Sequence, residues 1–346
     1  MMRIAEEDAR DLSKSLLMAR GAPEQHASLQ THVLIDAELK EHPSHGLQRL
    51  PRLLRRIENG LIDPEARGKG RWRSDALLEI DGQRGLGPVV AMNALDQLDQ
   101  RRLSTGIALA AIRNSNHLGM LAWYVERAAE RGAIAIALST SEALVHPYGG
   151  TRAMLGTNPI AVAVPTAERP FVLDLATSTV SMGKIHHHAA IGKQIPESWA
   201  RDAEGRTTTD ATAAKAGSLA PFGGAKGYGL GLAIELLVGA LAGSALSPDV
   251  RGTLDSEHVC NKGDVLILIA PDRSADMAER LSAYLDAVRA SEPADPDHPV
   301  QVPGDGAWKR RETSRRYGFE IDKRLWDELN ALSAENQSPR FIGHIQ

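Results

Sequence analysis

Residues 105–138 read TGIALAAIRNSNHLGMLAWYVERAAERGAIAIAL, and their pattern decides the fold. A strand-like apolar run at 105–112 is followed by a polar turn, a helical run at 121–131 and a second strand-like run at 133–138. Strand-like runs that alternate with helical runs are typical of layered α/β proteins. The stretch therefore predicts an α/β fold.

The alternation continues on both sides of this stretch, from about residue 75 to residue 290. Further strand-like runs lie at 77–80, 160–164, 171–173 and 265–269, and further helical runs lie at 89–98, 229–242 and 275–290. Residues 4–60 instead have apolar residues at helical spacing, with breaks at 21–23 and 42–43. A loop at 292–306 precedes a closing helix that begins near Asp322. We expect a helical N-terminal region, an α/β centre and a C-terminal helix.

Composition excludes several classes of protein. The chain has 346 residues, 42% of them hydrophobic, which is enough to bury a sizeable core. Its formal net charge of -4 argues against a nucleic-acid partner, because phosphate binding leaves a basic footprint. Two local basic runs, 49–56 and 309–316, are interpreted as solvated helix faces. Cys260 is the only cysteine, so no intramolecular disulfide is possible, which fits a reducing compartment.

We expect no targeting signal and no membrane partner. Residues 1–10 include three acidic side chains and lack the apolar core of a signal peptide. The longest apolar stretch, 229–245, carries Glu235 near its middle and is interpreted as a buried amphipathic helix. These features predict a cytoplasmic protein.

Two histidine motifs carry the strongest chemical signal. The first is Ser44–Gly46, with His45 at its centre and Arg49 four residues after the histidine. The second is Asn114–Gly119, which contains His117. Both motifs place an imidazole, which exchanges protons near neutral pH, among small turn-forming residues. This combination indicates acid/base chemistry and therefore an enzyme.

A glycine-rich run marks a second candidate site. The Rossmann fingerprint Gly-x-Gly-x-x-Gly between a strand and a helix is missing from the chain. Residues 223–231 nevertheless combine several glycines with Lys226 just before a helical segment. Two interpretations stay open: a phosphate site built from Lys226 and the helix N-terminus, and a glycine-rich turn with close helix packing.

The motifs, taken together, resemble the malate/L-lactate dehydrogenase superfamily, which also contains ureidoglycolate, sulfolactate and diketogulonate enzymes. They cover nearly the whole chain in the family's order: Ser-His-Gly with Arg49, Asn-His-Leu-Gly, Gly-Thr-Asn-Pro at 156–159, Asp-Leu-Ala-Thr-Ser at 174–178 through 181–185, Gly-Gly-x-Lys-Gly at 223–227, and Val-Pro-Gly at 302–304. Each motif is weak by itself, but their common order makes chance resemblance improbable.

This resemblance implies a fold and an activity. The fold is α/β, with a mixed sheet flanked by helices in the L-sulfolactate dehydrogenase-like arrangement, which is unrelated to the Rossmann fold. The activity is NAD- or NADP-dependent interconversion of a 2-hydroxy acid and a 2-oxo acid, or of a cyclic imine and an amine. The family also implies a homodimer with active sites near the subunit interface and a small carboxylate as substrate.

We divide the chain accordingly into three parts. Residues 1–75 form a mainly helical region that contributes catalytic residues. Residues 76–300 form the α/β cofactor-binding domain. Residues 301–346 form a loop and helix that pack back on the N-terminal region.

The matched positions receive provisional roles. His45 is our preferred proton donor, with Ser44 to orient it, because an imidazole changes its protonation state at modest cost. Arg49 is placed to bind the substrate carboxylate through its planar fork. His117 is the competing acid/base residue, because members of the family differ in which histidine is described as the donor. Thr157 is expected to contact the substrate or the nicotinamide.

Other positions are expected to hold the cofactor. The resemblance places these contacts at Asp174, Leu175, Ala176, Lys226, Gly227, Pro303 and Gly304. Ser139, at the end of a predicted strand, is a further cofactor contact. Three more histidines, at 186–188, could suggest a metal site, but they share no ligand-like spacing with an acidic residue or a cysteine, and hydride transfer needs no metal.

Three positions depart from the family or refine it. Leu53 replaces a tyrosine common in the family, which predicts a less polar substrate or a hydrogen-bond partner from elsewhere. Asp305 replaces a glutamate whose side chain is one methylene longer, so the cofactor contact made at this position in the family stays undecided here. Lys184 stands where the cyclic-imine reductases carry aspartate, and we expect it to contact substrate, which favours an oxo or hydroxy acid.

Two other functions stay open. One is a reductase of cyclic ketimines such as pyrroline or piperideine carboxylate. The other is a catalytically silent ligand-binding relative, although the intact Ser44, His45, Arg49, His117 and Lys226 argue against it.

Overall fold

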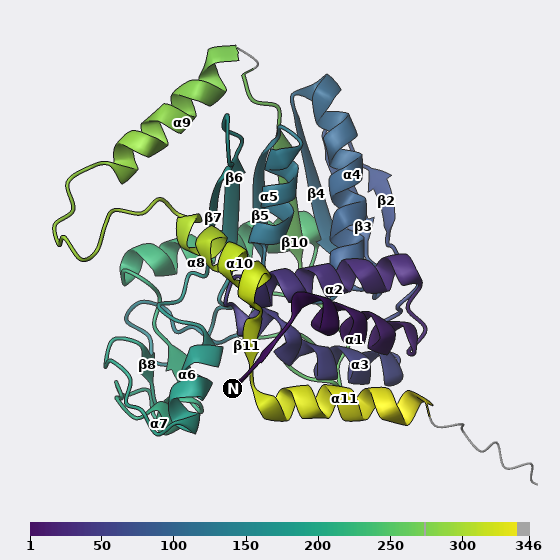
Figure 1. Cartoon of the computed structure of the whole chain (residues 1–346), viewed down its shortest axis with the longest axis vertical. Helices are drawn as coiled ribbons and strands as arrows, with labels where there is room; N and C mark the ends of the chain where they lie inside the picture. The colour runs from purple at the N-terminus through teal and green to yellow at the C-terminus, as the bar shows by residue number, and fades with distance from the viewer. Residues whose placement is uncertain (273–274, 338–346) are drawn as a thin grey trace, which may run out of the picture.

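A mixed sheet of seven strands runs through the middle of the molecule (Figure 1). The structure is a computed structural model that describes residues 1–272 and 275–337. The strand order is β2-β3-β4-β10-β5-β6-β7, with bounds Lys69–Trp72, Leu77–Asp81, Ile107–Arg113, Asp264–Ile269, Ile134–Ser139, Ile160–Val164 and Phe171–Leu175. β3 and β4 are parallel, and the other neighbours are antiparallel. The predicted mixed sheet is confirmed.

Different helices cover the two faces of this sheet. Ala108 and Ala110 of β4 belong to the core cluster formed with α4 (Gly87–Thr105) and α5 (Ala122–Glu130). Leu109, between them, belongs to the cluster formed with α8 (Ala225–Ala242) on the other face. Successive side chains of a strand point to opposite faces, so helices cover β4 on both sides, although Ile107 at its start is exposed. This double burial is why the predicted strands read as continuous apolar stretches.

The helix before β4 is longer than its apolar pattern predicts. The sequence indicates a helix over 89–98, whereas α4 extends to Thr105. The predicted strand at 105–112 correspondingly begins only at Ile107. Gly106 separates the two elements with a φ of 77°, a left-handed conformation that glycine adopts without strain and that ends the helix.

The N-terminal region is helical, as predicted. α1 (Glu6–Met18), α2 (Glu24–Leu39) and α3 (Leu50–Glu58) are interrupted at the predicted breaks, and the two short 3-10 turns η1 (Pro43–His45) and η2 (Leu47–Arg49) join α2 to α3. β1 (Met2–Ile4) pairs with β11 (Phe319–Ile321), and α11 (Lys323–Gln337) packs on α1. The first and last described segments therefore lie side by side (Figure 1).

The C-terminal part contains a helix that the sequence indicated only through the basic run at 309–316, which was interpreted as a solvated helix face. α10 (Asp305–Tyr317) follows the loop at 292–306, and only Asp305 and Ser314 among its residues are buried. It has almost no apolar periodicity to reveal it. Arg311 instead holds it by ion pairs with Asp36 of α2 and Glu126 of α5. The helix at α9 (Ala275–Arg289), by contrast, matches its predicted range closely.

A small unit lies beside the main sheet. It consists of α6 (Met182–Ala190), α7 (Ala211–Ala214), β8 (Ala200–Arg201) and β9 (Ser218–Leu219), and it has its own apolar cluster. Its strands are two residues long, too short to leave an alternating pattern in the sequence.

α8 is less buried than the sequence predicts. Only a third of the helix is buried, and Leu236 and Leu237 are 54% and 52% exposed. Within the described residues it is the one helix long and apolar enough to cross a membrane by length and composition alone. Its Glu235 is buried, however, and accepts hydrogen bonds from Asn158 and Ser247. α8 thus packs on the sheet with one side and presents an apolar surface with the other.

The two basic runs are not simply solvated, and that interpretation is wrong for several of their residues. Arg56 is buried, and Arg49 is half-buried. In the second run, Arg311 is mostly buried in its ion pairs, and Arg310 donates a hydrogen bond to the Lys40 carbonyl. The surrounding carboxylates and carbonyls hold these charges inside the fold.

Candidate active site

Two cavities meet at the first histidine motif. The outer groove has a volume of about 850 Å³ and is lined by residues of the β7 end and the start of α10. The inner pocket has a volume of about 600 Å³ and lies between η1–α3, the His117 loop and α6. Both cavities are lined by Ser44, His45, Gly119, Leu121, Thr157, Pro159 and Ser181. Two ligands, one in each cavity, would therefore meet at His45.

His45 is held in a tight turn between α2 and α3. Ser44 Oγ lies 3.0 Å from its Nδ1, so one ring nitrogen is engaged by the neighbouring hydroxyl. Burial, with Arg49 and His42 nearby, lowers the pKa of His45 to about 3. The ring is therefore neutral near pH 7 in the free protein and is able to accept a proton.

Contacts of Gly46 and Leu47 with Glu38 of α2 hold this turn in place. The backbone N–H of Leu47 donates to the Glu38 carboxylate at 2.6 Å, and a Cβ at Gly46 would lie only 2.2 Å from the same oxygen. Burial raises the pKa of Glu38 to about 7. The glycine of the Ser-His-Gly motif is thus required by close approach of a side chain.

His117 faces His45 across the inner pocket. The two ring centroids are 5.7 Å apart, and the planes are inclined at 31°. The backbone N–H of Gly119 donates to His117 Nδ1 at 3.0 Å, so in the neutral ring the proton sits on Nε2. Burial and the nearby Arg49 hold the pKa of His117 well below its usual value.

One face of α3 supplies cations to the inner pocket. Arg49, Arg52 and Arg56 follow at spacings of three and four residues, which places them on one side of the helix, while Leu53 and Leu54 face the core. Arg49 and Arg52 line the pocket. Neither forms an ion pair within the described part of the chain. Sequence reasoning missed Arg52, although this spacing from Arg49 was a signal that could have found it.

The backbone carbonyl of Ser44 positions the side chain of Arg49. Its Nε donates to the Ser44 carbonyl at 2.7 Å, which aligns the guanidinium beside the histidine motif. Burial lowers the pKa of Arg49 to about 10, so the group stays cationic near pH 7. A positive group beside two neutral imidazoles is suited to hold a carboxylate.

Most of the predicted cofactor contacts line the outer groove. They are Asp174, Leu175, Ala176, Pro303 and Gly304. The Asp174 carboxylate accepts a hydrogen bond of 2.7 Å from Ala122 N at the start of α5. The protein atoms around it raise the pKa of Asp174 to about 6. Gly304 adopts a φ of 95° against the Val172 carbonyl, which a Cβ would approach to 2.8 Å.

Asp305, the departure from the family's glutamate, also lines the groove. Both of its carboxylate oxygens are bound by Arg289, at 2.8 and 2.9 Å, and one also accepts from Val302 N. Arg289 holds the pKa of Asp305 below its usual value. This ion pair fastens α9 to the start of α10.

Thr157 and Ser139 lie deeper. Thr157 lines both cavities, as expected for a residue between substrate and nicotinamide. Ser139 was predicted as a cofactor contact, but it lines only the inner pocket. Its hydroxyl donates to Asp264 at 2.6 Å, beside the buried Lys262 that pairs with the same carboxylate. Lys262 lines the inner pocket too, and sequence reasoning did not identify it.

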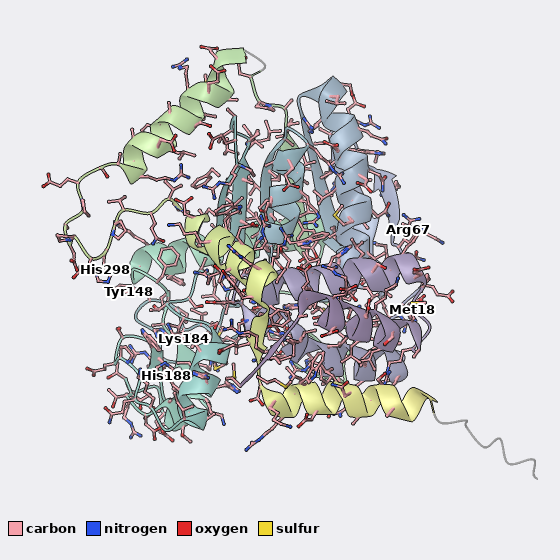
Figure 2. The ribbon with its side chains drawn as sticks, viewed as in Figure 1. Met18, Arg67, Tyr148, Lys184, His188 and His298 are labelled. Carbon is pink, nitrogen blue, oxygen red and sulfur yellow. The ribbon has the colours of Figure 1, made fainter. Side chains whose placement is uncertain are left out.

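Three predicted residues lie away from both cavities. The Lys184 ammonium packs 4.8 Å from the ring centre of Trp199 in the small unit, where Figure 2 shows it beside His188. Lys226 is exposed in the first turn of α8. Gly227 is buried, and a Cβ there would collide with the Phe222 carbonyl at 2.1 Å. Gly227 therefore serves close packing at the start of α8, whereas a Cβ at Gly223 or Gly229 would meet no atom within 4 Å.

Leu53 does not reach either cavity. It is buried in the core between α3 and the N-terminal helices. The helix turns Arg52 toward the inner pocket and Leu53 away from it. The expectation that this leucine alters substrate polarity is therefore not supported by its position.

The histidines of α6 split between two environments. His186 and His187 line the inner pocket, whereas His188 Nδ1 is 3.1 Å from the Gln194 carbonyl and its ring packs on Trp199. Across the described ranges, no cluster of three or more histidine, cysteine, aspartate or glutamate side chains has an arrangement that could hold a metal.

The outer groove fits a dinucleotide. It has positive side chains for a diphosphate in Arg169 and Arg310, the N-terminus of α10 along its lining, and the histidine motif where it meets the inner pocket. Trp308, stacked 4.1 Å from the Arg169 guanidinium, adds a flat apolar surface. These features suit a polar ligand with planar rings, with one end beside His45.

Known proteins are similar to this chain over almost its whole length. A family model described as malate/L-lactate dehydrogenase matches residues 4–330. The L-sulfolactate dehydrogenase of Methanocaldococcus jannaschii is 36% identical over 96% of this chain and 97% of its own, and its solved structure superposes with a TM-score of 0.91. A solved dehydrogenase from Sinorhizobium meliloti is 57% identical, covers 96% of this chain and 98% of its own, and has a TM-score of 0.93. The predicted fold is confirmed.

Two further relatives bear on cofactor and substrate. A (2R)-3-sulfolactate dehydrogenase (NADP(+)) from Chromohalobacter salexigens is 34% identical over 94% of this chain and 96% of its own. A Delta(1)-pyrroline-2-carboxylate reductase from Pseudomonas fluorescens is 33% identical over 93% of this chain and 96% of its own.

Proposed function

Because this chain belongs to the malate/L-lactate dehydrogenase family, we propose that it transfers a hydride between NAD or NADP and a 2-hydroxy acid. It is an oxidoreductase, and the product of oxidation is the 2-oxo acid. The observation that carries the proposal is the junction of the two cavities at Ser44 and His45. This junction puts a proton-exchanging group between a dinucleotide-sized groove and a cationic pocket.

The outer groove is the proposed cofactor site. Asp174, Leu175 and Ala176 would line one wall, and Pro303 and Gly304 would line the other. When bound, the nicotinamide supplies the acceptor or donor of the hydride. Both NAD and NADP remain in the proposal, since a named NADP(+) relative supports the second.

His45 is the proposed proton acceptor in oxidation and donor in reduction. Its ring is neutral near pH 7 because burial lowers its pKa, so it is ready to take the proton of the 2-hydroxyl. Ser44 Oγ engages Nδ1, which leaves Nε2 for the substrate. In the neutral ring of His117 the proton is on Nε2, because Nδ1 already accepts from Gly119 N. We infer that His117 donates a hydrogen bond to the substrate oxygen.

The proposed substrate anchor is the arginine face of α3. Arg49 is aligned by the Ser44 carbonyl and would bind the carboxylate next to the reacting carbon. Arg52 and Lys262 add two more cations to the same pocket, although Lys262 is already paired with Asp264. The negative charge of a substrate beside the histidines would also offset the positive charge of Arg49. This compensation favours protonation of His45, which the reduction direction needs.

A cyclic ketimine reductase is the second candidate. The relative named as a pyrroline-2-carboxylate reductase supports it, and the substrate of such an enzyme also carries a carboxylate. The position of Lys184, outside both cavities, neither adds a cation to the substrate nor provides the acidic group expected in that subgroup.

We also propose that the protein forms a homodimer through α8. The exposed side of that helix is apolar, and Tyr148, which lies against its first turn, is also exposed. A contiguous apolar surface of this kind marks an interaction site. A second copy is the occupant that the family implies.

A substrate panel tests the activity. 2-Hydroxy acids, 2-oxo acids and cyclic imines are assayed with NAD, NADP and their reduced forms by the absorbance of the reduced nicotinamide. We expect turnover of at least one hydroxy acid and its oxo acid. Turnover of imines alone would establish the second candidate. No turnover by the folded protein with any member would contradict both.

A further inference from the structure

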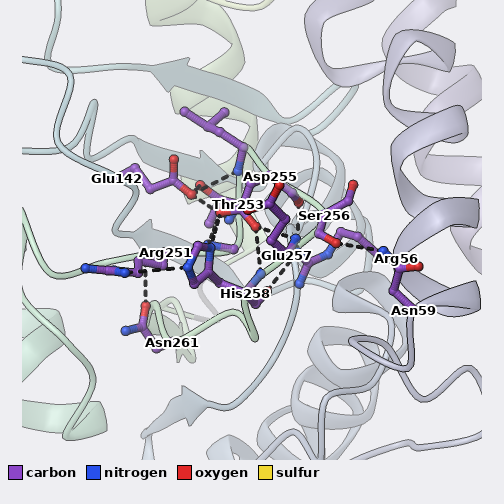
Figure 3. Close-up of polar contacts among 12 residues, drawn as sticks. Arg56, Asn59, Glu142, Arg251, Thr253, Asp255, Ser256, Glu257, His258 and Asn261 are labelled. Atoms are coloured by element: carbon purple, nitrogen blue, oxygen red, sulfur yellow. Dashed lines mark hydrogen bonds and ion pairs between the residues drawn. The ribbon is translucent and has the colours of Figure 1, made fainter.

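The segment 251–262 forms a wall of the inner pocket and is tied down from two sides (Figure 3). Thr253 and Leu254, near its start, line the pocket. The Asp255 carboxylate closes the following turn by accepting from the backbone N–H groups of Glu257 and His258, both at 2.8 Å. The wall is therefore a compact turn whose position depends on its outside contacts.

Glu142 holds the pocket side of this wall. One of its carboxylate oxygens accepts from Thr253 N at 2.8 Å, from Thr253 Oγ1 at 3.1 Å and from Leu254 N at 2.9 Å. Glu142 follows β5 closely in the chain, so this contact links the wall to the sheet. Hydrogen bonds from backbone N–H groups to a carboxylate are among the stronger ones in proteins.

Arg56 holds the other side. Its Nη1 donates to the carbonyls of Asp255 and His258, at 2.9 and 3.0 Å. Its Nη2 donates to Asn116 Oδ1 at 3.0 Å, and Asn116 directly precedes His117. One guanidinium thus joins α3, the wall and the histidine loop.

Burial of the charged Arg56 side chain costs free energy, which a residue with only a packing role would not require. The side chain is buried, and within the described residues it forms no ion pair, so three neutral oxygens carry its hydrogen bonds. Burial lowers the pKa of Arg56 accordingly. Burying a charge without a counter-ion is expensive, and hydrogen bonds held in a fixed geometry offset part of that cost. The planar fork of arginine reaches three separate oxygens here, and the ammonium of a lysine has no such fork.

We propose that Arg56 is a positioning residue of the active site. It sets the distance between the substrate-binding arginines of α3, the His117 loop and the Thr253–Leu254 wall, and so it controls substrate binding without contacting substrate. The proposal rests on the proposed function of the inner pocket. Glu142 is its counterpart on the sheet side.

Arg56→Met, with Arg55→Met as control, tests this assignment. Arg55 is the neighbouring residue in α3 and is exposed. Its substitution removes the same positive charge but none of the three hydrogen bonds of Arg56. We expect Arg56→Met to raise KM for the hydroxy acid by about tenfold or more, while cofactor Kd stays within about twofold, since charged hydrogen bonds are lost on the substrate side alone. Arg55→Met should leave both constants unchanged.

Hydrogen exchange gives a readout that does not depend on turnover. The backbone amides of Thr253 and Leu254, and those of residues 116–119, should lose protection in Arg56→Met and not in Arg55→Met. Should the wild-type protein turn over nothing, the proposed function fails while this measurement still decides the role of Arg56. Unchanged exchange in a folded Arg56→Met protein would overturn the proposal.

Three further variants, two of which leave Arg56 in place, cover the case in which Arg56→Met does not fold. Arg56→Ala with added guanidinium, well below denaturing concentration, should recover substrate KM as the ion fills the vacated site. Glu142→Ala should raise substrate KM in the same sense, and Glu142→Gln should do so less, because its amide oxygen still accepts. An equal rise in cofactor Kd and substrate KM in these variants would show general damage and contradict a positioning role.

Discussion

His45 occupies the junction of the two cavities, so its side chain is the most direct test of the proposed chemistry. We predict that His45→Ala lowers kcat by about 100-fold or more, the usual worth of general acid/base catalysis, and leaves cofactor Kd nearly unchanged. Steady-state kinetics and cofactor titration measure the two effects. His188→Ala is the matched control, because that histidine packs on Trp199 outside both cavities. Wild-type turnover in His45→Ala would remove this residue from the mechanism.

The lowered pKa of His45 gives a second prediction at this scale. A base must be unprotonated, and a pKa of about 3 in place of about 6.5 keeps it so well below neutrality. For oxidation of the hydroxy acid, kcat/KM should therefore stay level from about pH 8 to about pH 5, because it reports the free enzyme. For reduction, which needs the protonated ring, kcat/KM should rise about tenfold per pH unit as the pH falls. A pH profile in both directions decides this, and an acid limb near pH 6.5 in oxidation would contradict it.

Among single residues, the sequence predicted the two histidines and Arg49 as a group, and the structure brings them together. Arg52 and Arg56 were hidden because their run was interpreted as a solvated face, although their spacing from Arg49 puts all three on one side of α3. No sequence motif or spacing marked Lys262 as a site residue. Its place beside Ser139 follows from the pairing of β5 with β10, which are more than a hundred residues apart.

At the scale of elements, α10 shows how a helix can be held by charge. Its N-terminus lies on the outer groove, and Asp305 fastens it to α9 through both oxygens of its carboxylate. The polar sequence of α10 has no apolar stripe, so its charge pattern indicated a helix face at 309–316, but neither its bounds nor its ion pairs. The ion pairs that hold it join residues from distant parts of the chain.

We predict that Asp305→Asn weakens cofactor binding by about five- to tenfold, because loss of a two-oxygen arginine contact frees the Pro303–Gly304 turn. The control is Asp286→Asn, which removes an exposed partner of the same Arg289 and should change little. Fluorescence titration with reduced nicotinamide cofactor measures both. Equal cofactor affinities in wild type and Asp305→Asn would show that the turn is held without this ion pair.

At the scale of the whole molecule, the apolar side of α8 needs a partner. We predict that Leu236→Asp converts the proposed dimer to a monomer, because a charge at the centre of an apolar interface is not compensated there. The change should not affect folding, since Leu236 is 54% exposed. Light scattering after size-exclusion chromatography measures the mass. Leu103→Asp, at an exposed position of α4, is the control, and a wild-type monomer would contradict the prediction.

The family resemblance gave the fold, the order of the motifs and most groove residues, while local patterns placed the strands that are buried on both faces. Short strands of the small unit and the start of β4 were outside the reach of periodicity. Lys184 and Lys226 matched family motifs yet lie outside the two cavities formed within one chain. The predicted division at residues 75 and 300 stays a prediction, as do the site roles.

By itself, the sequence determined the α/β class, the helical N-terminal region and the chemical groups of the site, because these depend on local spacing and residue type. Only the tertiary structure decided how those groups meet. It joined the groove to the pocket at His45, gave the Nδ1 atoms of the two histidines different partners in Ser44 Oγ and Gly119 N, and placed Arg56 between three distant segments. Such contacts depend on long-range pairing of strands and on burial of charge, and no local pattern records either.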